Sequence, residues 1–175
     1  MFRFLHSADL HLGKPYGSMP DELRGRLREA RHTVLDRLAA RARDGGAETI
    51  LLAGDVFDTE TPSLPVLRQA LAAMAEHESL RWILLPGNHD SLAAEALWAG
   101  LAKALPANVV LATEPTPLRL AEDVVLLPGP CTTRRPGRDL TEWMDMAATP
   151  PGAIRIGLAP GAAQSVSEDG GARDA

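Results

Sequence analysis

The sequence predicts an α/β layered fold, and three observations lead to this prediction. Short strands that are apolar throughout, such as residues 49–53 (TILLA), alternate along the chain with longer segments of helical periodicity. A strand that is apolar on both faces is typical of a parallel sheet that is covered on both sides. Polar loops follow several of these strands directly, and in α/β folds such loops carry the functional residues.

The first half of the chain has the clearest periodicity. Apolar residues recur at helical spacing from Leu23 to Ala42, with arginine and glutamate between them, and Gly45 and Gly46 end this segment as a helix cap. The elements that we expect here, in chain order, are a strand at 2–7, one helix at 21–44, a strand at 49–53, a helix at 64–77, a strand at 82–85 and a helix at 93–105.

The second half is less regular, and a long loop (PGPCTTRRPGRD) interrupts it. Residues 162–175 have no periodicity and no apolar run. We therefore interpret residues 1–161 as one domain and residues 162–175 as a polar tail. The elements that we expect in this half are strands at 109–111, 118–120 and 124–127, a short helix at 140–146 and a strand at 154–158.

The composition excludes several classes of protein. Hydrophobic residues make up 45% of the 175 residues and charged residues 23%, which is ordinary for a soluble globular domain. Cys131 is the only cysteine, so no disulfide can form within the chain. No apolar run is long enough to cross a bilayer, and Asp9 and His11 interrupt the amino-terminal segment where a signal peptide needs an apolar core. We therefore expect a cytoplasmic protein.

The first polar loop contains Asp9-Leu10-His11. Side chains two residues apart on an extended chain point the same way, so this carboxylate and this imidazole would project together from the end of the first strand. Oxygen and nitrogen ligands suit a borderline divalent cation such as Mn²⁺, Fe²⁺ or Zn²⁺. Taken alone, the pattern is more typical of an Asx turn with a surface histidine.

The second polar loop begins with Gly54 and Asp55 and reaches Asp58. Glycine lets the chain turn sharply after the strand, and the two oxygens of Asp55 suit a carboxylate that bridges two metal ions. Asp58 is a candidate to orient a metal ligand, without binding the metal itself, by accepting a hydrogen bond from that ligand or from a backbone donor. The alternative interpretation is a turn or a helix-capping aspartate, which is common after a strand.

The third polar loop contains Asn88, His89 and Asp90. Asn88 offers a carbonyl oxygen to a metal ion, and His89 could donate a proton to a leaving group. Asp90 is expected to hold the imidazole of His89 in one tautomer. Each of the three loops is modest support by itself, but three such loops in order, each at the carboxyl end of an apolar strand, favour a divalent-metal site over unrelated turns.

The three motifs, D-x-H, G-D-x-x-D and G-N-H-D, resemble the signature of the calcineurin-like metallophosphoesterases. The residues around the motifs (FLHSADLHLG, LAGDVFDTETPS and LPGNHDS) are similar to the SbcD/Mre11 branch of that superfamily, which consists of DNA-repair exonucleases. The resemblance is strong over residues 1–100 and looser from there to Leu158. It implies a metallophosphoesterase-type β-sandwich flanked by helices.

The resemblance also implies a role for each residue of the motifs. Asp9 and His11 would bind the first metal, Asp55 would bridge both metals, Asn88 would bind the second, and His89 would be the catalytic histidine. The implied activity is that of a nuclease, a hydrolase that cleaves DNA phosphodiester bonds with two divalent metal ions, most commonly Mn²⁺. The implied partners are DNA (double-stranded ends or single strands), an SMC-like ATPase subunit and a second copy of the chain, with no membrane.

The chain also departs from the family pattern. Pro160 stands after the strand at 154–158, where the family has a ligand histidine, and no histidine follows His89. The terminal G-H-x-H motif of the family is therefore missing from this sequence. We expect the domain to be partial, with its sandwich incomplete at the carboxyl end and sheet edges exposed.

Three functions therefore remain open at this point. The first is a DNA-repair nuclease, the second is a phosphoesterase that acts on nucleotides or other small phosphate esters, and the third is a non-catalytic homologue. Arg24, Arg28 and Arg31 lie on one helical face, which we interpret as a solvated face opposite the leucine stripe.

Overall fold

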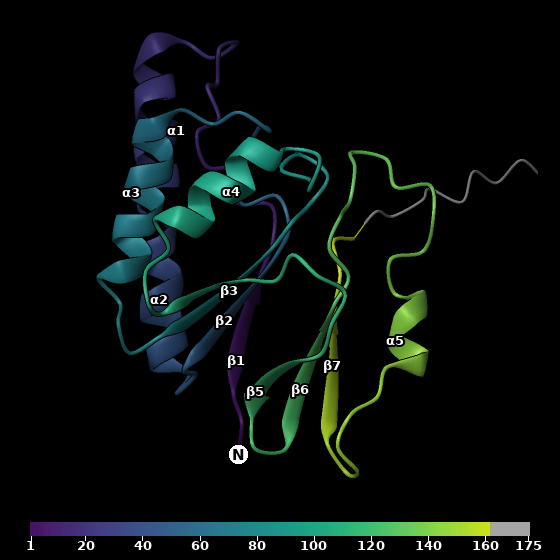
Figure 1. Cartoon of the computed structure of the whole chain (residues 1–175). Helices are drawn as coiled ribbons and strands as arrows, with labels where there is room; N and C mark the ends of the chain where they lie inside the picture. Colours follow the sequence, from purple (N-terminus) through teal and green to yellow (C-terminus); the bar gives the residue numbers. More distant parts are fainter. Residues whose placement is uncertain (162–175) are drawn as a thin grey trace, which may run out of the picture.

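The computed structural model describes residues 1–161, which form two β-sheets (Figure 1). The first sheet has four parallel strands in the order β1-β2-β3-β4. In the second sheet, of order β5-β6-β7, β5 runs antiparallel to β6 and β7 runs parallel to it. The strands are β1 (Phe4–Ser7), β2 (Thr49–Ala53), β3 (Arg81–Leu85), β4 (Val109–Leu111), β5 (Leu118–Ala121), β6 (Val124–Pro128) and β7 (Ile154–Leu158).

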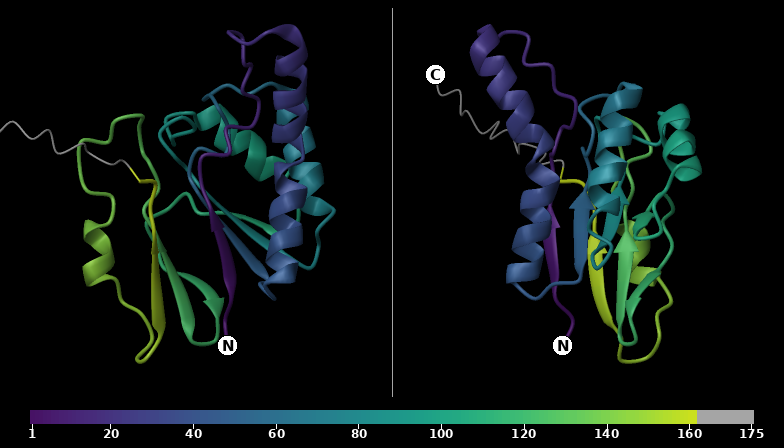
Figure 2. Two further views of the ribbon diagram at one scale, coloured as in Figure 1. Left: turned by 180° about the vertical axis from the view of Figure 1, so that it is seen from behind. Right: turned by 90° about the vertical axis from the view of Figure 1, so that its left-hand side faces the viewer.

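Helices cover the outer sides of this pair of sheets (Figures 1 and 2). The four longer helices lie on the side of the first sheet, and the short α5 lies on the side of the second sheet. The helices are α1 (Asp21–His32), α2 (Val34–Asp44), α3 (Leu64–Ala75), α4 (Glu95–Lys103) and α5 (Glu142–Met146).

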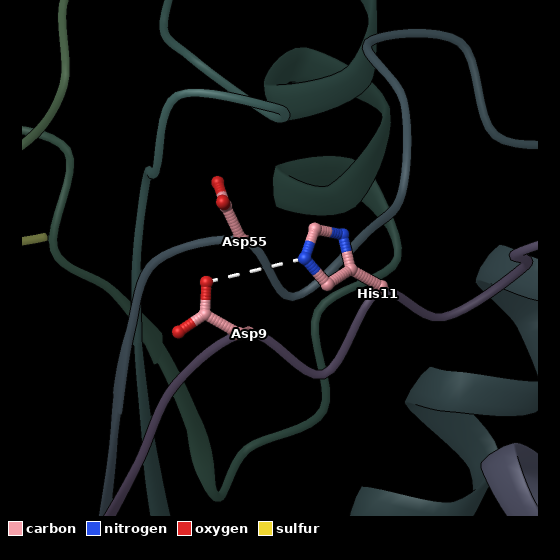
Figure 3. A group of neighbouring side chains, drawn as sticks. All are labelled: Asp9, His11 and Asp55. Atoms are coloured by element: carbon pink, nitrogen blue, oxygen red, sulfur yellow. Dashed lines mark ion pairs between the residues drawn. The ribbon is translucent and has the colours of Figure 1, made fainter. Parts of the chain in front are cut away.

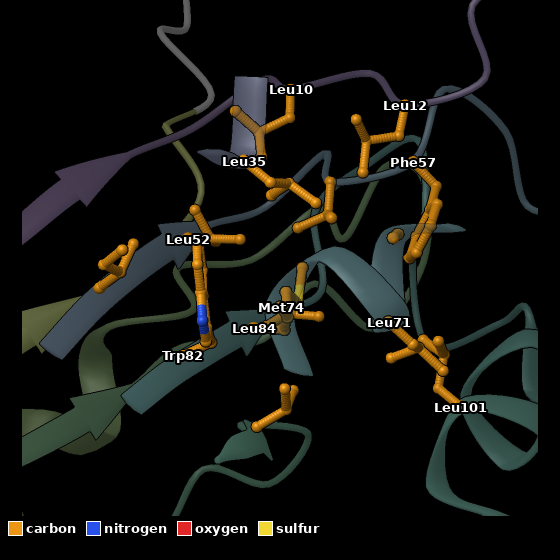
Figure 4. Packing of buried hydrophobic residues seen from close by; sticks show 14 of the residues in the cluster. Leu10, Leu12, Leu35, Leu52, Phe57, Leu71, Met74, Trp82, Leu84 and Leu101 are labelled. Carbon is orange, nitrogen blue, oxygen red and sulfur yellow. The ribbon is translucent and has the colours of Figure 1, made fainter. Parts of the chain in front are cut away.

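The two central strands of the first sheet, β2 and β3, are buried on both faces. Their successive side chains point to opposite sides of the sheet and pack into different clusters. Ile50 and Leu52 of β2 pack into the cluster under the helices, part of which Figure 4 shows. Leu51, between them in sequence, packs instead with Leu126 of β6 in a cluster between the two sheets. A smaller cluster joins β6 to Met144 of α5. The layers are therefore helices, first sheet, second sheet and α5, which confirms the predicted α/β sandwich.

The segment at 21–44 is two helices instead of the single helix that we predicted. Thr33 separates α1 from α2, and its hydroxyl bonds back to the carbonyl of Ala30 at 3.3 Å, a local bond that competes with helix continuation. Leu35, Ala39 and Ala42 of α2 are buried, whereas α1 has no buried residue. The apolar periodicity of α1 therefore does not report packing against the main core.

The other elements lie where the periodicity predicts them, with ends that shift by up to two residues. None of the helices within residues 1–161 is both long and apolar enough to span a membrane. The predicted polar tail, residues 162–175, lies outside the described residues.

The parallel register of β1, β2 and β3 determines where the functional loops lie. Ser7 of β1 is opposite Leu52 of β2, and Leu52 is opposite Leu84 of β3, so these strands end at the same edge of the sheet. The three polar loops that follow them therefore begin side by side, as the carboxyl ends of neighbouring parallel strands do.

Candidate metal centre

The loops after β1 and β2 are joined by backbone hydrogen bonds that continue the strand pairing. The amides of Asp9 and His11 donate to the carbonyls of Gly54 and Asp55 at 3.2 and 2.9 Å, and the amide of Leu12 donates to the carbonyl of Val56 at 2.8 Å. These bonds fix the first loop against the second, so the side chains of the two loops share one site.

Asp9, His11 and Asp55 come together at this site (Figure 3). One ligand atom of each of the three residues lies within 4.8 Å of those of the other two. Asp55 is 5% exposed and the His11 side chain 16%, whereas the Asp9 side chain is 70% exposed. The cluster thus has a buried base and an open side, and its oxygen and nitrogen donors suit a divalent cation such as Mn²⁺, Fe²⁺ or Zn²⁺.

The backbone at these three residues is unusual. Asp9, His11 and Asp55 have φ values of 55°, 45° and 52°, in the left-handed region that residues other than glycine rarely adopt. Such conformations cost of order 1–3 kcal/mol each and persist only where the surrounding structure enforces them. Their concentration at one cluster supports a functional reason for this shape.

Asp55 is held by the third loop as well as by its own strand. Its Oδ1 accepts a hydrogen bond from the backbone amide of His89 at 2.8 Å. A Cβ atom added to Gly87 would lie 2.2 Å from both the amide nitrogen and Oδ1 of Asp55, so only glycine fits at that position. The backbone of the third loop at Gly87 therefore lies in direct contact with Asp55, with no room for a side chain between them.

Asp58 lies behind the ring of His11. Its Oδ1 is 3.2 Å from Nδ1 of His11 and 3.6 Å from Nζ of Lys14. The direction of the His11–Asp58 contact is poor for a hydrogen bond, because Nδ1 has no well-aligned acceptor among the described residues. We therefore describe it as an electrostatic contact, which favours a proton on Nδ1 and leaves Nε2, 3.9 Å from Oδ1 of Asp9, as the unprotonated nitrogen on the side of the cluster.

His89 is half-buried beside the cluster, and Asn88, the residue before it in the third loop, is exposed. The imidazole rings of His89 and His11 meet edge to face, with centroids 4.9 Å apart. Nδ1 of His89 is 3.2 Å from the backbone carbonyl of Asp58, so a proton on Nδ1 would be donated there. In that tautomer Nε2 is the unprotonated nitrogen of the ring.

Asp90 does not orient His89, so that expectation was wrong. Its fully buried carboxylate accepts three backbone hydrogen bonds, from Asp55 at 3.2 Å, Phe57 at 3.0 Å and Gly87 at 2.7 Å. Burial is the main reason that the pKa of Asp90 is raised, although these hydrogen bonds act in the opposite direction. Asp90 is thus a structural tie between the second and third loops, because side-chain acceptors are needed where two loops bury their amides together.

The arginine face of α1 is partly solvated, as expected, because Arg28 is exposed, but its arginines also contact the segment before the helix. Arg31 is half-buried and donates to the carbonyl of Leu10, while Arg28 and Arg24 donate to the carbonyls of Pro15 at 3.0 Å and Met19 at 3.2 Å. All three acceptors belong to the segment that joins β1 to α1. The spacing of the arginines, at i, i+4 and i+7, was visible in the sequence, but the segment they contact was not.

The second sheet sends two loops to the same place. The amide of Cys131, after β6, donates to the carbonyl of Pro86 at 3.0 Å, and a Cβ atom on Gly54 would lie 3.0 Å from the Cβ of Pro160, after β7. The pKa of the Cys131 thiol is raised, chiefly by burial and then by the negative charges of Asp55 and Asp90. The two residues that the second sheet brings to the cluster are thus a cysteine with a neutral thiol and a proline.

The comparisons with known proteins agree with this geometry. The sequence matches the calcineurin-like phosphoesterase family over residues 2–151. It is 36% identical over 92 residues to the SbcD subunit of the nuclease SbcCD of Bacillus subtilis, a match that covers 51% of this chain and 22% of that protein. For the SbcD subunit of the same nuclease in Escherichia coli K12 the identity is 35% over 94 residues, covering 52% and 22%.

A third relative is the DNA double-strand break repair protein Mre11 of Haloferax volcanii, which is 30% identical over 93 residues, covering 52% of this chain and 20% of that protein. Each match thus spans about a fifth of the length of the relative. The family match covers most of the chain, including all three loops of the candidate metal centre. The chain therefore belongs to the calcineurin-like phosphoesterase family.

Proposed function

We propose that this chain carries the metal-binding part of a divalent-metal-dependent phosphodiesterase that hydrolyses DNA phosphodiester bonds. The observation that carries the proposal is the convergence of Asp9, His11 and Asp55, with ligand atoms within 4.8 Å of one another, at the loops that match the family. The choice of DNA as substrate is supported by the similarity of the amino-terminal half to proteins that are named as a nuclease and a DNA double-strand break repair protein.

In this proposal Asp9 and His11 would hold the first metal ion, Asp55 would contribute to both ions, and Asn88 would hold the second. The donor set fits, because carboxylate and amide oxygens with one imidazole suit Mn²⁺, and Fe²⁺ or Zn²⁺ as alternatives. When bound, such ions act as Lewis acids on a phosphate group and lower the pKa of water. The exposed side of the cluster, at Asp9, is where a phosphodiester would approach.

His89 is the proposed catalytic residue. Its Nδ1 faces the carbonyl of Asp58, so in the imidazolium form, with a proton on each nitrogen, Nε2 would carry the proton that passes to the leaving oxygen. The edge-to-face packing of this ring against His11, a proposed metal ligand, supports the role, because a phosphate bound to the metal would lie nearby. The partners in this proposal are DNA, an SMC-like ATPase subunit and a second copy of the chain.

The test is Mn²⁺ binding to the purified chain by calorimetry, followed by assays on a short DNA duplex, single-stranded DNA and a chromogenic phosphodiester. We expect saturable binding that Asp55→Asn abolishes, because the mutation removes the charge of the shared ligand. The matched control is Asp123→Asn, which makes the same change at an exposed turn far along the chain. Failure of the folded wild-type chain to bind Mn²⁺ would sink the proposal. Cleavage of the chromogenic ester without cleavage of DNA would favour small phosphate esters.

A second candidate is a non-catalytic homologue, and the position of Pro160 is the observation that favours it. The family resemblance predicts a ligand histidine at this place, and the structure puts the Pro160 side chain against Gly54, next to Asp55. Proline has no donor atom for a metal on its side chain. Tight Mn²⁺ binding without hydrolysis of any of the three substrates would support this candidate over the nuclease.

A further inference from the structure

The β1–α1 loop, residues 8–20, is held from two sides. On one side its amides donate to the second loop, as those of His11 and Leu12 do to the carbonyls of Asp55 and Val56. On the other side its carbonyls accept hydrogen bonds from the arginines of α1. Backbone amides on one side of the loop and backbone carbonyls on the other therefore both have hydrogen-bond partners. Such bonds on both sides hold the loop backbone in one conformation.

Arg31 is the arginine that acts nearest to the metal ligands. Its Nη1 donates to the carbonyl of Leu10 and lies 3.4 Å from the carbonyl of Asp9. Its Nε donates to the hydroxyl of Tyr16, and its guanidinium carbon lies 5.9 Å from the centre of the Tyr16 ring. One planar guanidinium group thus connects the part of the loop that carries the ligands to a point several residues later, a geometry that a lysine cannot reproduce.

The conformation that Arg31 braces is one the loop would not adopt unaided. Asp9, His11 and Tyr16 all have positive φ, of 55°, 45° and 52°. Residues other than glycine leave this region readily unless neighbouring groups enforce it. Two of the three are the ligands of the proposed first metal, and the third is the residue that holds Nε of Arg31.

We propose that Arg31 is a positioning residue for the metal centre. It holds the β1–α1 loop in the left-handed conformation that presents Asp9 and His11 together, and Tyr16 holds the guanidinium in place. Arg31 does not itself contact the ligand atoms, so its effect passes through the backbone of Asp9 and Leu10. The inference rests on the proposed function for the identity of the ligand, and on the loop contacts for its mechanism.

The test compares Arg31→Ala, Arg31→Lys and Tyr16→Phe with Arg26→Ala, which removes an exposed arginine from the same helix. Mn²⁺ affinity is measured by calorimetry, and hydrogen exchange of the His11 and Leu12 amides is measured without metal. For Arg31→Ala we expect binding weakened by about 10- to 100-fold, the loss that is typical when a support of a metal ligand is removed. Exchange should speed up at these two amides but not in β2 or β3.

The other variants separate charge from geometry. Arg31→Lys keeps the positive charge but loses the planar guanidinium group that reaches several acceptors at once, so its Mn²⁺ binding should still be weakened. Tyr16→Phe should weaken Mn²⁺ binding to a smaller extent. Arg26→Ala should behave like the wild-type chain. Wild-type affinity and exchange in Arg31→Ala would overturn the inference, and so would faster exchange spread equally through β2 and β3, which indicates general destabilisation.

Two further outcomes are also decisive. Should Arg31→Ala fail to fold, the milder Tyr16→Phe variant decides the matter, and unchanged exchange at His11 in that variant would overturn the inference. A wild-type chain that binds no Mn²⁺ would overturn the proposed function, while the exchange rates of the metal-free variants would still show whether Arg31 holds the loop.

Discussion

The two sheets deliver loops to the same edge of the molecule but supply different chemistry there. The loops of the first sheet bring the carboxylates and imidazole of the candidate metal centre, including Asp55. Those of the second sheet reach the same place, since Cys131 bonds to Pro86 and Pro160 lies against Gly54, yet they bring a thiol and a proline ring. The fold thus determines which loops meet, whereas the loop sequences determine what the meeting point can bind.

The two sheets also differ in how many backbone contacts hold their loops at the candidate metal centre. In the first sheet, Asp90 ties the second and third loops through three amides, and Gly87 lets the third loop touch Asp55. The loops of the second sheet are attached to this core through fewer bonds, among them the one from the Cys131 amide. The metal centre should therefore be sensitive to changes in first-sheet backbone and tolerant of changes in the second sheet.

Gly87→Ala should produce the largest effect. The added Cβ would lie 2.2 Å from two atoms of Asp55, and overpacking of this kind costs about 3 kcal/mol or more when backbone has to move. We expect the free energy of unfolding, from urea denaturation, to fall by that amount and Mn²⁺ binding to disappear. Gly100→Ala in α4 is the control, because nothing lies within 4 Å of its Cβ and alanine favours a helix by about 0.5–1 kcal/mol. Equal stability of the two variants would contradict the close approach.

Much of this site could be predicted from the sequence, because strand ends and polar loops are local patterns. The convergence of Asp9, His11 and Asp55 follows from two neighbouring strands, β1 and β2, that run parallel and end at the same edge of the sheet. The role of Asp90 could not be predicted from the sequence. The pair His89-Asp90 looks the same in the sequence whether the carboxylate contacts the imidazole ring or the backbone amides of another loop. Periodicity likewise shows that Arg31 shares a face with other arginines, but not that a loop earlier in the chain folds back onto it.

Pro160→His tests whether a loop of the second sheet can supply a metal ligand to the candidate metal centre. The Cβ of residue 160 is next to Gly54, so an imidazole there would be directed at the neighbourhood of Asp55. We expect Mn²⁺ binding to tighten by about tenfold, at the lower end of the effects seen when a metal site gains or loses support. Calorimetry measures the change, with Pro150→His at an exposed turn as the control. Equal affinities of both variants and the wild-type chain would show that residue 160 does not face the centre.

Cys131→Ala should produce the smallest effect and should leave the metal centre intact. The buried thiol donates to the carbonyl of Thr133 at 3.0 Å and so points along its own loop. Removing it should lower the free energy of unfolding by about 1 kcal/mol, through lost burial and one hydrogen bond, without changing Mn²⁺ affinity. Denaturation and calorimetry on the same sample measure both quantities.

The raised pKa of this thiol adds a second readout. Burial and the nearby carboxylates of Asp55 and Asp90 disfavour the thiolate, so at neutral pH Cys131 is a neutral thiol in the folded chain. Alkylation by iodoacetamide, followed by mass spectrometry, should be slower than in the unfolded chain and should speed up only as the pH rises above the usual thiol range. Protection from alkylation by added Mn²⁺, together with weaker binding in Cys131→Ala, would make the thiol a ligand. The two sheets would then share the metal centre, and the contrast between their loops would no longer hold.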